Sequence, residues 1–452
     1  MAKQKVWYSC NKCTYQTPKW IGCCPECKQW NTFQEEKQFT SIAGRSSSIK
    51  HISTTRLTRL QSVDSTPQKR MLSGISEWDR VIGSGIMPSS LLILTGDPGI
   101  GKSTLLLQVA NQLSQKYIVY YFSTEESLQQ VKLRAQRLGC AKGNLLFSDQ
   151  SELETIVATS KKDSPDIVII DSIQNCYIPN ASSLPGSTGQ LRESTFHLMR
   201  FAKEHNITVL LTGHITKDGN IAGPKTLEHM VDGVFYLQGE DRLDTRILRS
   251  VKNRFGTINE LGFFQMGQHG LQEVPNINAH LLSEVSHSPG SVLISIMEGS
   301  RPLLLELQAL TIESKLGIAQ RVVSGVDHKQ VVLIAAILEK YLHVKLSSND
   351  IFLKISGGFK IKGSAIDLGI ALALLSSYFQ QPIPEQSIAL GEISLTGHIK
   401  PVNQISTFVK EAQKFGIKQL LVAKNQKIEQ SQCVVKRFFS VYELLSLFDA
   451  DK

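Results

Sequence analysis

The sequence has no long uninterrupted apolar run. A helix that crosses a bilayer needs about 20 mostly apolar residues, and charged residues, which make up 20% of the chain, break up every stretch of that kind. The first residues, Met1 to Trp7, also lack the apolar segment of a secretory signal. The sequence therefore predicts a cytoplasmic protein without a membrane partner.

Cysteine is scarce outside the first 27 residues, where five of the eight cysteines lie. This clustering argues against a disulfide framework and favours a metal site. Two CxxC knuckles can supply the four thiolates of a closed, structural Zn²⁺ shell. Buried free thiols or a redox pair are the alternatives, and Cys23 is a fifth cysteine beside the second knuckle. The predicted zinc ligands are Cys10, Cys13, Cys24 and Cys27.

Acidic residues are outnumbered, with 40 Asp and Glu against 49 Lys and Arg, which gives a net charge of +9. A basic balance favours a polyanionic partner, because each neutralised phosphate releases condensed counterions. Many soluble proteins are mildly basic, so the charge alone does not predict nucleic-acid binding.

The length of 452 residues is typical of about three domains. Residues 1–34 form the predicted four-cysteine zinc finger, and residues 35–67, rich in Ser, Thr, Lys and Arg, a flexible basic tether. In residues 68–274, apolar runs alternate with helical patterns, which indicates strands buried on both faces of a parallel sheet. Residues 275–289 are a predicted connector, and residues 290–452 again mix strands and helices.

A phosphate-binding pattern, G-x-x-x-x-G-K-[ST], follows the apolar strand Leu91–Thr95 and precedes the helical stretch Lys102–Leu113. Its backbone N–H groups and the helix N-terminus suit phosphates. Lys102 is expected to reach the β- and γ-phosphates of ATP, and Ser103 to bind Mg²⁺. The predicted nucleotide-binding residues are Gly96, Asp97, Pro98, Gly99, Ile100, Gly101, Lys102, Ser103 and Thr104.

Carboxylates follow two further predicted strands. Asp171 ends the apolar strand Ile167–Ile170, where a carboxylate can hold Mg²⁺ through its water shell. Glu125 and Glu126 follow the strand Tyr117–Phe122 and can orient the attacking water. The alternative is that the two glutamates only cap the next helix.

Three motifs outside the P-loop are distinctive. They are the two knuckles in the form Cys10-Asn-Lys-Cys13 and Cys24-Pro-Glu-Cys27, the segment Leu72 to Gly83 before the P-loop, and Lys252-Asn-Arg-Phe-Gly256. Together they resemble the RadA (Sms) family of bacterial DNA-repair proteins, whose hallmark is K-N-R-F-G. The C-terminal region resembles the Lon protease domain, so the resemblance covers almost the whole chain.

This resemblance implies an α/β chain with a zinc ribbon-like module, a RecA-like P-loop ATPase core with a mostly parallel sheet, and a C-terminal α+β Lon-like domain. It implies a hexameric, DnaB-like motor that hydrolyses ATP on single-stranded DNA and promotes branch migration in recombination. The implied partners are single-stranded and branched DNA, the RecA recombinase and other copies of the chain. It also favours Glu125 over Glu126 as the base.

Lys252 and Arg254 lie two residues apart after the predicted strand Arg246–Val251 and would point the same way on a strand. Two such cations can complete a neighbouring subunit's ATP site, a role worth about 10³–10⁵ in rate in other phosphoryl-transfer systems. The alternative is a solvated basic turn. The resemblance favours a catalytic role and leaves open whether the pair contacts ATP, DNA or both.

A further group of predictions concerns the segment after the strand Ile207–Leu211. His214 is placed to sense the γ-phosphate, although a lone histidine is more often structural. The loops around residues 182–190 and 217–225 are candidate DNA contacts, with phosphate-binding roles expected for Arg192, Lys217 and Lys225 as well as for Lys252 and Arg254. The alternative is that these loops are exposed connections.

The Lon-like region is predicted not to cut peptides. The resemblance places Ala365 at the nucleophile position, with Ser364 one residue away, and Ser406 at the position of the lysine base. Lys410 lies one helical turn further, about 6 Å along the axis, too far for a nucleophile–base hydrogen bond. We expect a scaffold for ring assembly and DNA contact. The competing functions are a RecA-like strand-exchange filament, an ATP-switched DNA-binding scaffold and an ATP-dependent protease.

Overall fold

A computed structural model describes residues 6–10, 12–13, 16–17, 19–20, 22–30, 32–37, 59–62, 69–140, 143–179, 184–214, 227–240, 243–258, 260–283, 285–315, 319–361, 363–429 and 431–448. The chain divides into two compact units, Met1–Thr66 and Pro67–Lys452. In the described parts, no helix is both long enough and apolar enough to cross a membrane.

The first unit contains a small antiparallel sheet in which β1 (Val6–Cys10) pairs with β2 (Gln16–Thr17) and with β3 (Phe33–Lys37). β3 runs beyond residue 34, the predicted end of the zinc finger, because its residues pair with β1 along their whole length. Between β2 and β3 the chain turns at Lys28, whose φ is 57° and whose N–H donates to the carbonyl of Cys24 at 2.8 Å.

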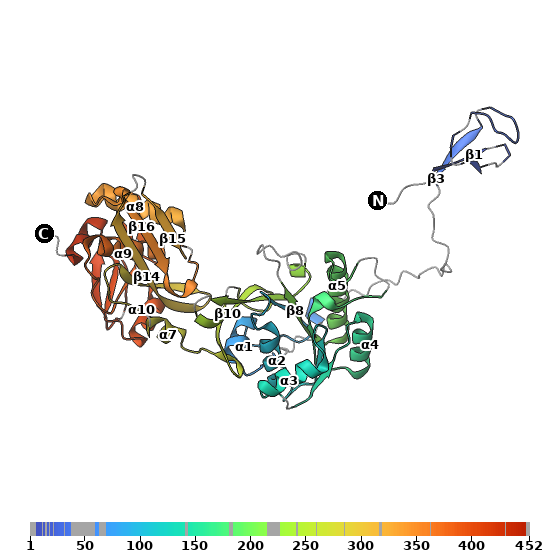
Figure 1. The fold of residues 1–452 in the computed structure, drawn as a ribbon, viewed down its shortest axis with the longest axis horizontal. Coiled ribbons are helices and arrows are strands. Elements are labelled where there is room, and N and C mark those ends of the chain that lie inside the picture. Colours follow the sequence, from blue (N-terminus) through green and yellow to red (C-terminus); the bar gives the residue numbers. More distant parts are fainter. Residues whose placement is uncertain are drawn as a thin grey trace. The chain divides into compact units, whose positions relative to one another are not determined.

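The N-terminal half of the second unit is built on a nine-stranded sheet with the order β12-β11-β10-β9-β4-β8-β7-β5-β6 (Figure 1). The six strands β4, β5, β6, β7, β8 and β9 pair in parallel. From β9 onward, each of the strands β10, β11 and β12 pairs antiparallel with the strand before it. The strand bounds are β4 (Leu91–Gly96), β5 (Val119–Ser123), β6 (Leu145–Ser148), β7 (Ile167–Asp171), β8 (Thr208–His214), β9 (Gly233–Glu240), β10 (Leu243–Asn253), β11 (Leu261–Gly267) and β12 (Gly270–Glu273).

Helices cover both faces of the parallel part, as the unbroken apolar runs predict. One face packs with α2 and α3 through residues such as Leu92, Leu94 and Leu106, and α1 packs against the antiparallel strands β10 and β11. The other packs with α4 and α5 through Leu91, Ile93 and related residues (Figure 1). The helix bounds are α1 (Ser76–Ile82), α2 (Lys102–Leu113), α3 (Leu128–Arg137), α4 (Leu153–Asp163) and α5 (Thr188–His205).

The C-terminal half contains a seven-stranded mixed sheet with the order β15-β16-β14-β13-β17-β20-β21, and a separate pair, β18 with β19. Helix α9 is buried along almost its whole length against this sheet, which explains its nearly uniform apolar sequence. The bounds are α7 (Ile277–Ser283), β13 (Ser291–Glu298), β14 (Arg301–Glu313), β15 (Arg321–Ser324), α8 (His328–Leu342), β16 (Asn349–Ile355), α9 (Asp367–Phe379), β17 (Ser387–Leu390), β18 (Glu392–Ile393), β19 (Ile399–Lys400), α10 (Ile405–Lys414), β20 (Gln419–Ala423) and β21 (Val434–Phe438).

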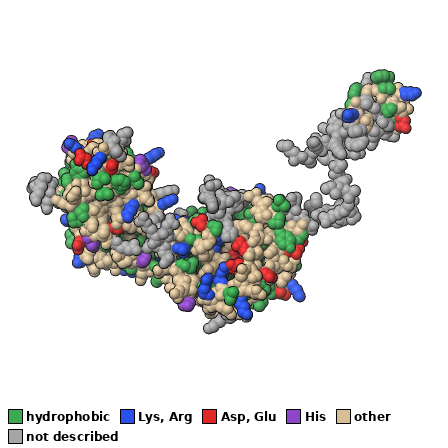
Figure 2. Space-filling view, in the orientation of Figure 1, with side chains coloured by type: hydrophobic (Ala, Val, Ile, Leu, Met, Phe, Trp, Pro, Cys, Tyr) green, Lys and Arg blue, Asp and Glu red, His purple; other side chains and the backbone are tan. Residues whose placement is uncertain are grey.

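Side chains from the two halves of this unit contact each other. The Arg301 guanidinium pairs with Glu77 at 3.3 Å and lies over the Phe263 ring, 5.6 Å from its centroid. Arg249 pairs with Glu298 at 3.2 Å. Helix α7 lies within the predicted connector and packs Ile277 and Leu281 into the same core as Phe263. On the face drawn in Figure 2, basic and acidic side chains are interspersed rather than gathered in one basic patch.

Candidate ATPase site

The predicted catalytic groups lie at the carboxyl ends of neighbouring parallel strands, where ligands bind in open α/β sheets. The P-loop follows β4, the two glutamates follow β5, and Asp171 ends β7, which pairs with β5 and β8. The sheet order therefore brings together residues that lie far apart in the sequence.

The P-loop needs glycine at two positions for physical reasons. Gly96 has a φ of 154°, and a Cβ there would lie 2.2 Å from the carbonyl oxygen of Leu237 on β9. Gly101 has a φ of 114° and precedes α2, whose first residue is Lys102. The loop thus places backbone N–H groups and the helix N-terminus where phosphates bind in other P-loops.

Lys102 is buried, and its ammonium donates to the carbonyl oxygens of Gly96 and Asp97, each at 2.9 Å. Burial lowers the pKa of Lys102, while the carboxylates of Asp171 and Glu125 oppose that shift. The ammonium therefore lies in the electrostatic field of both predicted catalytic acids.

Asp171 is held by two hydroxyl groups that sequence reasoning missed. Tyr121 donates to Oδ2 at 2.7 Å, and Thr212 on β8 donates to Oδ1 at 2.5 Å. Burial, and then the Asp171 charge, raises the pKa of Tyr121 well above its usual value, so the phenol stays a donor. No local sequence pattern pointed to these partners, because they reach Asp171 through the order of β5, β7 and β8 in the sheet. With the Ser103 hydroxyl at the start of α2, this fixed carboxylate fits a Mg²⁺ site.

The two glutamates after β5 have different partners. Glu125 accepts a short hydrogen bond from Ser172, the residue after Asp171. Glu126 forms an ion pair with Arg134 on α3 instead. Ser127 and Gln130 form the capping box of α3, so neither glutamate is its N-cap residue. This geometry favours Glu125 as the carboxylate that acts on water.

Lys252 and Arg254 are both bound within their own subunit. The Lys252 ammonium donates to the carbonyl of Glu228, and Arg254 pairs with the buried Asp232 at 3.3 Å. β10 ends at Asn253, so Lys252 lies on the strand and Arg254 lies just beyond its end. Both side chains contact the segment Glu228–Asp232.

The structure describes only some of the other predicted DNA-binding and sensor residues. Arg192 lies exposed on α5. His214 is the last residue of β8, and its side chain is outside the described part of the chain. Lys217 and Lys225 also lie outside the described residues. Their roles stay predictions.

The sulfur atoms of Cys10, Cys13, Cys24 and Cys27 all lie within 4.8 Å of one another. Cys23 is not in this group, and its thiol donates to the carbonyl of Cys24 at 3.8 Å. The hydrogen bond between Cys10 and Thr32 lowers the pKa of the Cys10 thiol to about 6. Four converging sulfurs of this kind fit Zn²⁺ in a closed tetrahedral shell.

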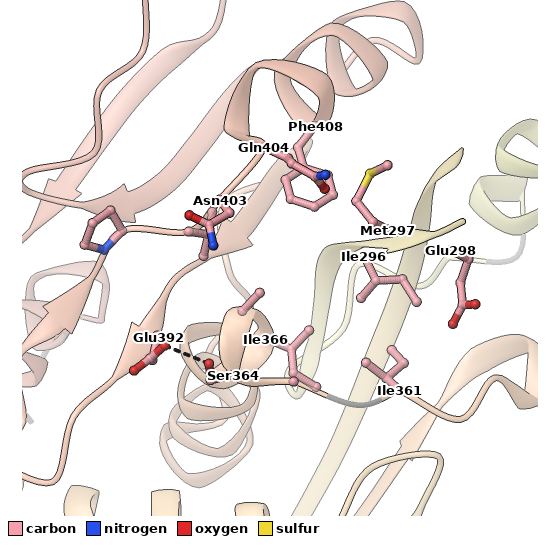
Figure 3. Close-up of a pocket in the computed structure, with 14 residues that line it drawn as sticks. Ile296, Met297, Glu298, Ile361, Ser364, Ile366, Glu392, Asn403, Gln404 and Phe408 are labelled. Atoms are coloured by element: carbon pink, nitrogen blue, oxygen red, sulfur yellow. Dashed lines mark hydrogen bonds between the residues drawn. The ribbon is translucent and has the colours of Figure 1, made fainter. Parts of the chain in front are cut away.

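A cavity of about 310 Å³ in the C-terminal half is lined by Ser364 and Ala365, the two candidates for the former nucleophile (Figure 3). The Ser364 hydroxyl donates to the Glu392 carboxylate at 2.7 Å rather than to a lysine. Ser406 and Lys410 are exposed and do not line the cavity. The described residues thus contain no serine–lysine pair in this cavity.

Family models match three parts of the chain. Residues 8–35 match "Rubredoxin metal binding domain", residues 55–220 match "AAA domain", and residues 317–426 match "Subunit ChlI of Mg-chelatase". Among solved structures, a KaiC-like protein of Pyrococcus horikoshii has a TM-score of 0.39 and 20% identity, covering 46% of this chain and 100% of its own. The RadB recombinase has a TM-score of 0.36 and 22% identity, covering 45% of this chain and 99% of its own.

Similarity to curated proteins extends over nearly the whole chain. The DNA repair protein RadA of Streptococcus pyogenes serotype M3 is 43% identical over 435 residues, which cover 96% of each chain. That of Bacillus subtilis is 42% identical, and the match covers 93% of each chain. With its zinc ribbon, RecA-like P-loop ATPase core and C-terminal Lon-like region, the chain belongs to the DNA repair protein RadA family.

Proposed function

We propose that the chain is a DNA-dependent ATPase that works as a hexameric, DnaB-like motor on single-stranded DNA and promotes branch migration of RecA-made intermediates. The observation that carries the ATPase part is the arrangement around Lys102. Glu125 and Asp171 lie in its electrostatic field, and hydrogen bonds orient both carboxylates. In this assignment Lys102 binds the phosphates, Asp171 and Ser103 hold Mg²⁺, and Glu125 orients the attacking water.

The coupling to DNA depends on Lys252 and Arg254. Through Glu228 and Asp232 they contact the chain that follows the candidate DNA loop of residues 217–225. A change at either cation therefore removes a contact with Glu228 or Asp232. Contact with a neighbouring subunit's ATP requires the cations to leave these partners.

The test is ATP hydrolysis by the full-length protein with and without single-stranded DNA. Lys102→Ala should abolish hydrolysis, and Lys252→Ala should abolish its stimulation by DNA. Lys132→Ala, which removes an exposed lysine on α3, is the matched control. Slow ATP hydrolysis whose rate does not change when single-stranded DNA is added would favour the ATP-switched scaffold. Unaltered stimulation in Lys252→Ala would remove the coupling role of that residue.

A further inference from the structure

A short turn, η2 (Ile173–Asn175), lies beside the segment that carries the predicted base. It begins directly after Ser172, whose hydroxyl donates to the carboxylate of Glu125. At its other end, the Asn175 side chain donates from Nδ2 to the carbonyl oxygen of Thr124 at 3.4 Å. The turn is therefore hydrogen bonded on both sides to the chain around Glu125, and a shift of the turn moves that carboxylate.

Gln174, in the middle of this turn, approaches two further elements. A Cβ on Gly213, near the end of β8, would lie 3.5 Å from Nε2 of Gln174. A Cβ on Gly186, before α5, would lie 3.6 Å from the carbonyl oxygen of Gln174. Gly213 follows Thr212, which holds the predicted Mg²⁺ ligand, and Gly186 belongs to residues 184–190, the described part of a candidate DNA loop. One residue thus lies between the ATPase site and that loop.

Three buried polar atoms at η2 and α5 have no hydrogen-bond partner among the described residues. They are Oε1 of Gln174, Oε1 of Gln190 and Oγ of Ser194. Gln190 and Ser194 lie one helical turn apart on the buried face of α5, which packs against η2. Buried polar groups are nearly always hydrogen bonded. A rearrangement of η2 and α5 that gives these atoms partners is therefore favourable.

We propose that Gln174 is a positioning residue that couples DNA bound at residues 184–190 to the placement of Glu125. DNA contact shifts this segment, the Gln174 amide gains a hydrogen bond, and the turn carries the shift through the Ser172 hydroxyl to the carboxylate of Glu125. The inference rests on the proposed DNA-dependent ATPase and names the residue through which its two sites communicate. Gln174 acts through Ser172 and is not itself a catalytic residue.

Coupling between two binding sites is reciprocal, so nucleotide must change DNA affinity by the same factor as DNA changes nucleotide affinity. The test measures the fluorescence anisotropy of a labelled thymidine oligonucleotide with the full-length, zinc-loaded protein, with and without a non-hydrolysable ATP analogue and Mg²⁺. In wild type the analogue should change DNA affinity at least about fivefold. Gln174→Met keeps the length of the side chain and removes its amide, so the analogue should change DNA affinity less than about twofold. Gln129→Met, at an exposed glutamine on α3, is the matched control and should behave like wild type.

Steady-state ATP hydrolysis separates positioning from a purely structural effect. Gln174→Met should lower the DNA-stimulated kcat at least about fivefold and leave KM for ATP unchanged. Ser172→Ala, which removes the hydrogen bond to Glu125, is a second variant and should lose the same coupling. Full coupling in both variants, or a raised KM for ATP in Gln174→Met with coupling intact, overturns this inference and leaves the proposed function in place. A wild-type protein in which DNA does not change hydrolysis and nucleotide does not change DNA affinity refutes the proposed DNA-dependent ATPase, and this inference with it.

Discussion

The hydrogen bonds around Asp171 support its proposed role in binding Mg²⁺. Its two oxygens are oriented by Tyr121 and Thr212 before a metal ion binds. Partners of this kind tune metal ligands, and their loss costs about 10–100-fold in metal affinity or activity. We therefore expect Tyr121→Phe to raise the Mg²⁺ concentration needed for ATP turnover by about tenfold.

Tyr120→Phe is the control for this prediction, because the Tyr120 hydroxyl bonds to Asp163 at 3.0 Å, outside the site. Turnover is measured over a Mg²⁺ titration. Identical Mg²⁺ dependence for Tyr121→Phe and wild type would contradict the role given to this phenol.

The adjacent glutamates allow a second matched comparison. Glu125→Gln should lower ATP turnover by about 10²–10⁴-fold, the usual contribution of a general base. Glu126→Gln should leave it within a few-fold of wild type, since Glu126 is paired with Arg134. The measurement is the rate of single-turnover hydrolysis at saturating ATP, compared between Glu125→Gln and Glu126→Gln. A larger loss in Glu126→Gln would reverse the assignment.

Sequence patterns predict the catalytic and metal-binding residues better than they predict the side chains that hydrogen bond to those residues. The P-loop and the two CxxC knuckles follow from spacing, because phosphate and zinc shells constrain the local chain. Asp171 follows from its position at the end of an apolar strand. Tyr121 and Thr212 reach Asp171 only through the order of β5, β7 and β8 in the sheet. No local pattern encodes that order.

Among elements, the zinc module is the one most dependent on a bound ion. Its short strands leave it with little core, so the four converging cysteines are expected to hold one zinc per chain. Cys24→Ser should lose this zinc, whereas Cys23→Ser should retain it. Zinc content is read from the metal released by a thiol-modifying reagent. Loss of zinc in both variants would mean that Cys23 is needed for the shell.

Helices and parallel strands are the elements that the sequence predicts best. The helix expected over Lys102–Leu113 has those bounds, because the P-loop glycine starts it and the buried Ser114, whose hydroxyl donates to the carbonyl of Asn111, caps its end. β10 was harder to predict, since its pairing with β9 and β11 extends it well beyond the apolar run. Long-range pairing of this kind overrides local propensity.

At the scale of the second unit, Arg301 joins the ATPase half to the C-terminal half. It pairs with Glu77, lies over Phe263 and donates to the carbonyl of Pro275 at 2.6 Å. Arg301→Ala removes all three contacts, so we expect the two halves to unfold in separate calorimetric steps. Lys315→Ala, at an exposed lysine, is the control. A single unchanged transition in Arg301→Ala would show that apolar packing alone couples the halves.

The hydrogen bond of Lys252 and the ion pair of Arg254 have a consequence for energy transfer in the proposed ring. Each cation already has an oxygen partner within its own subunit, at Glu228 and Asp232. For Arg254, moving to a neighbour's phosphate in the proposed ring exchanges one anionic oxygen partner for another, so the net free energy is a small difference between similar interactions. A nearly balanced exchange can be driven forward by binding ATP and backward by releasing phosphate. In the proposed motor, this reversibility would let the same contact be made and broken in every cycle.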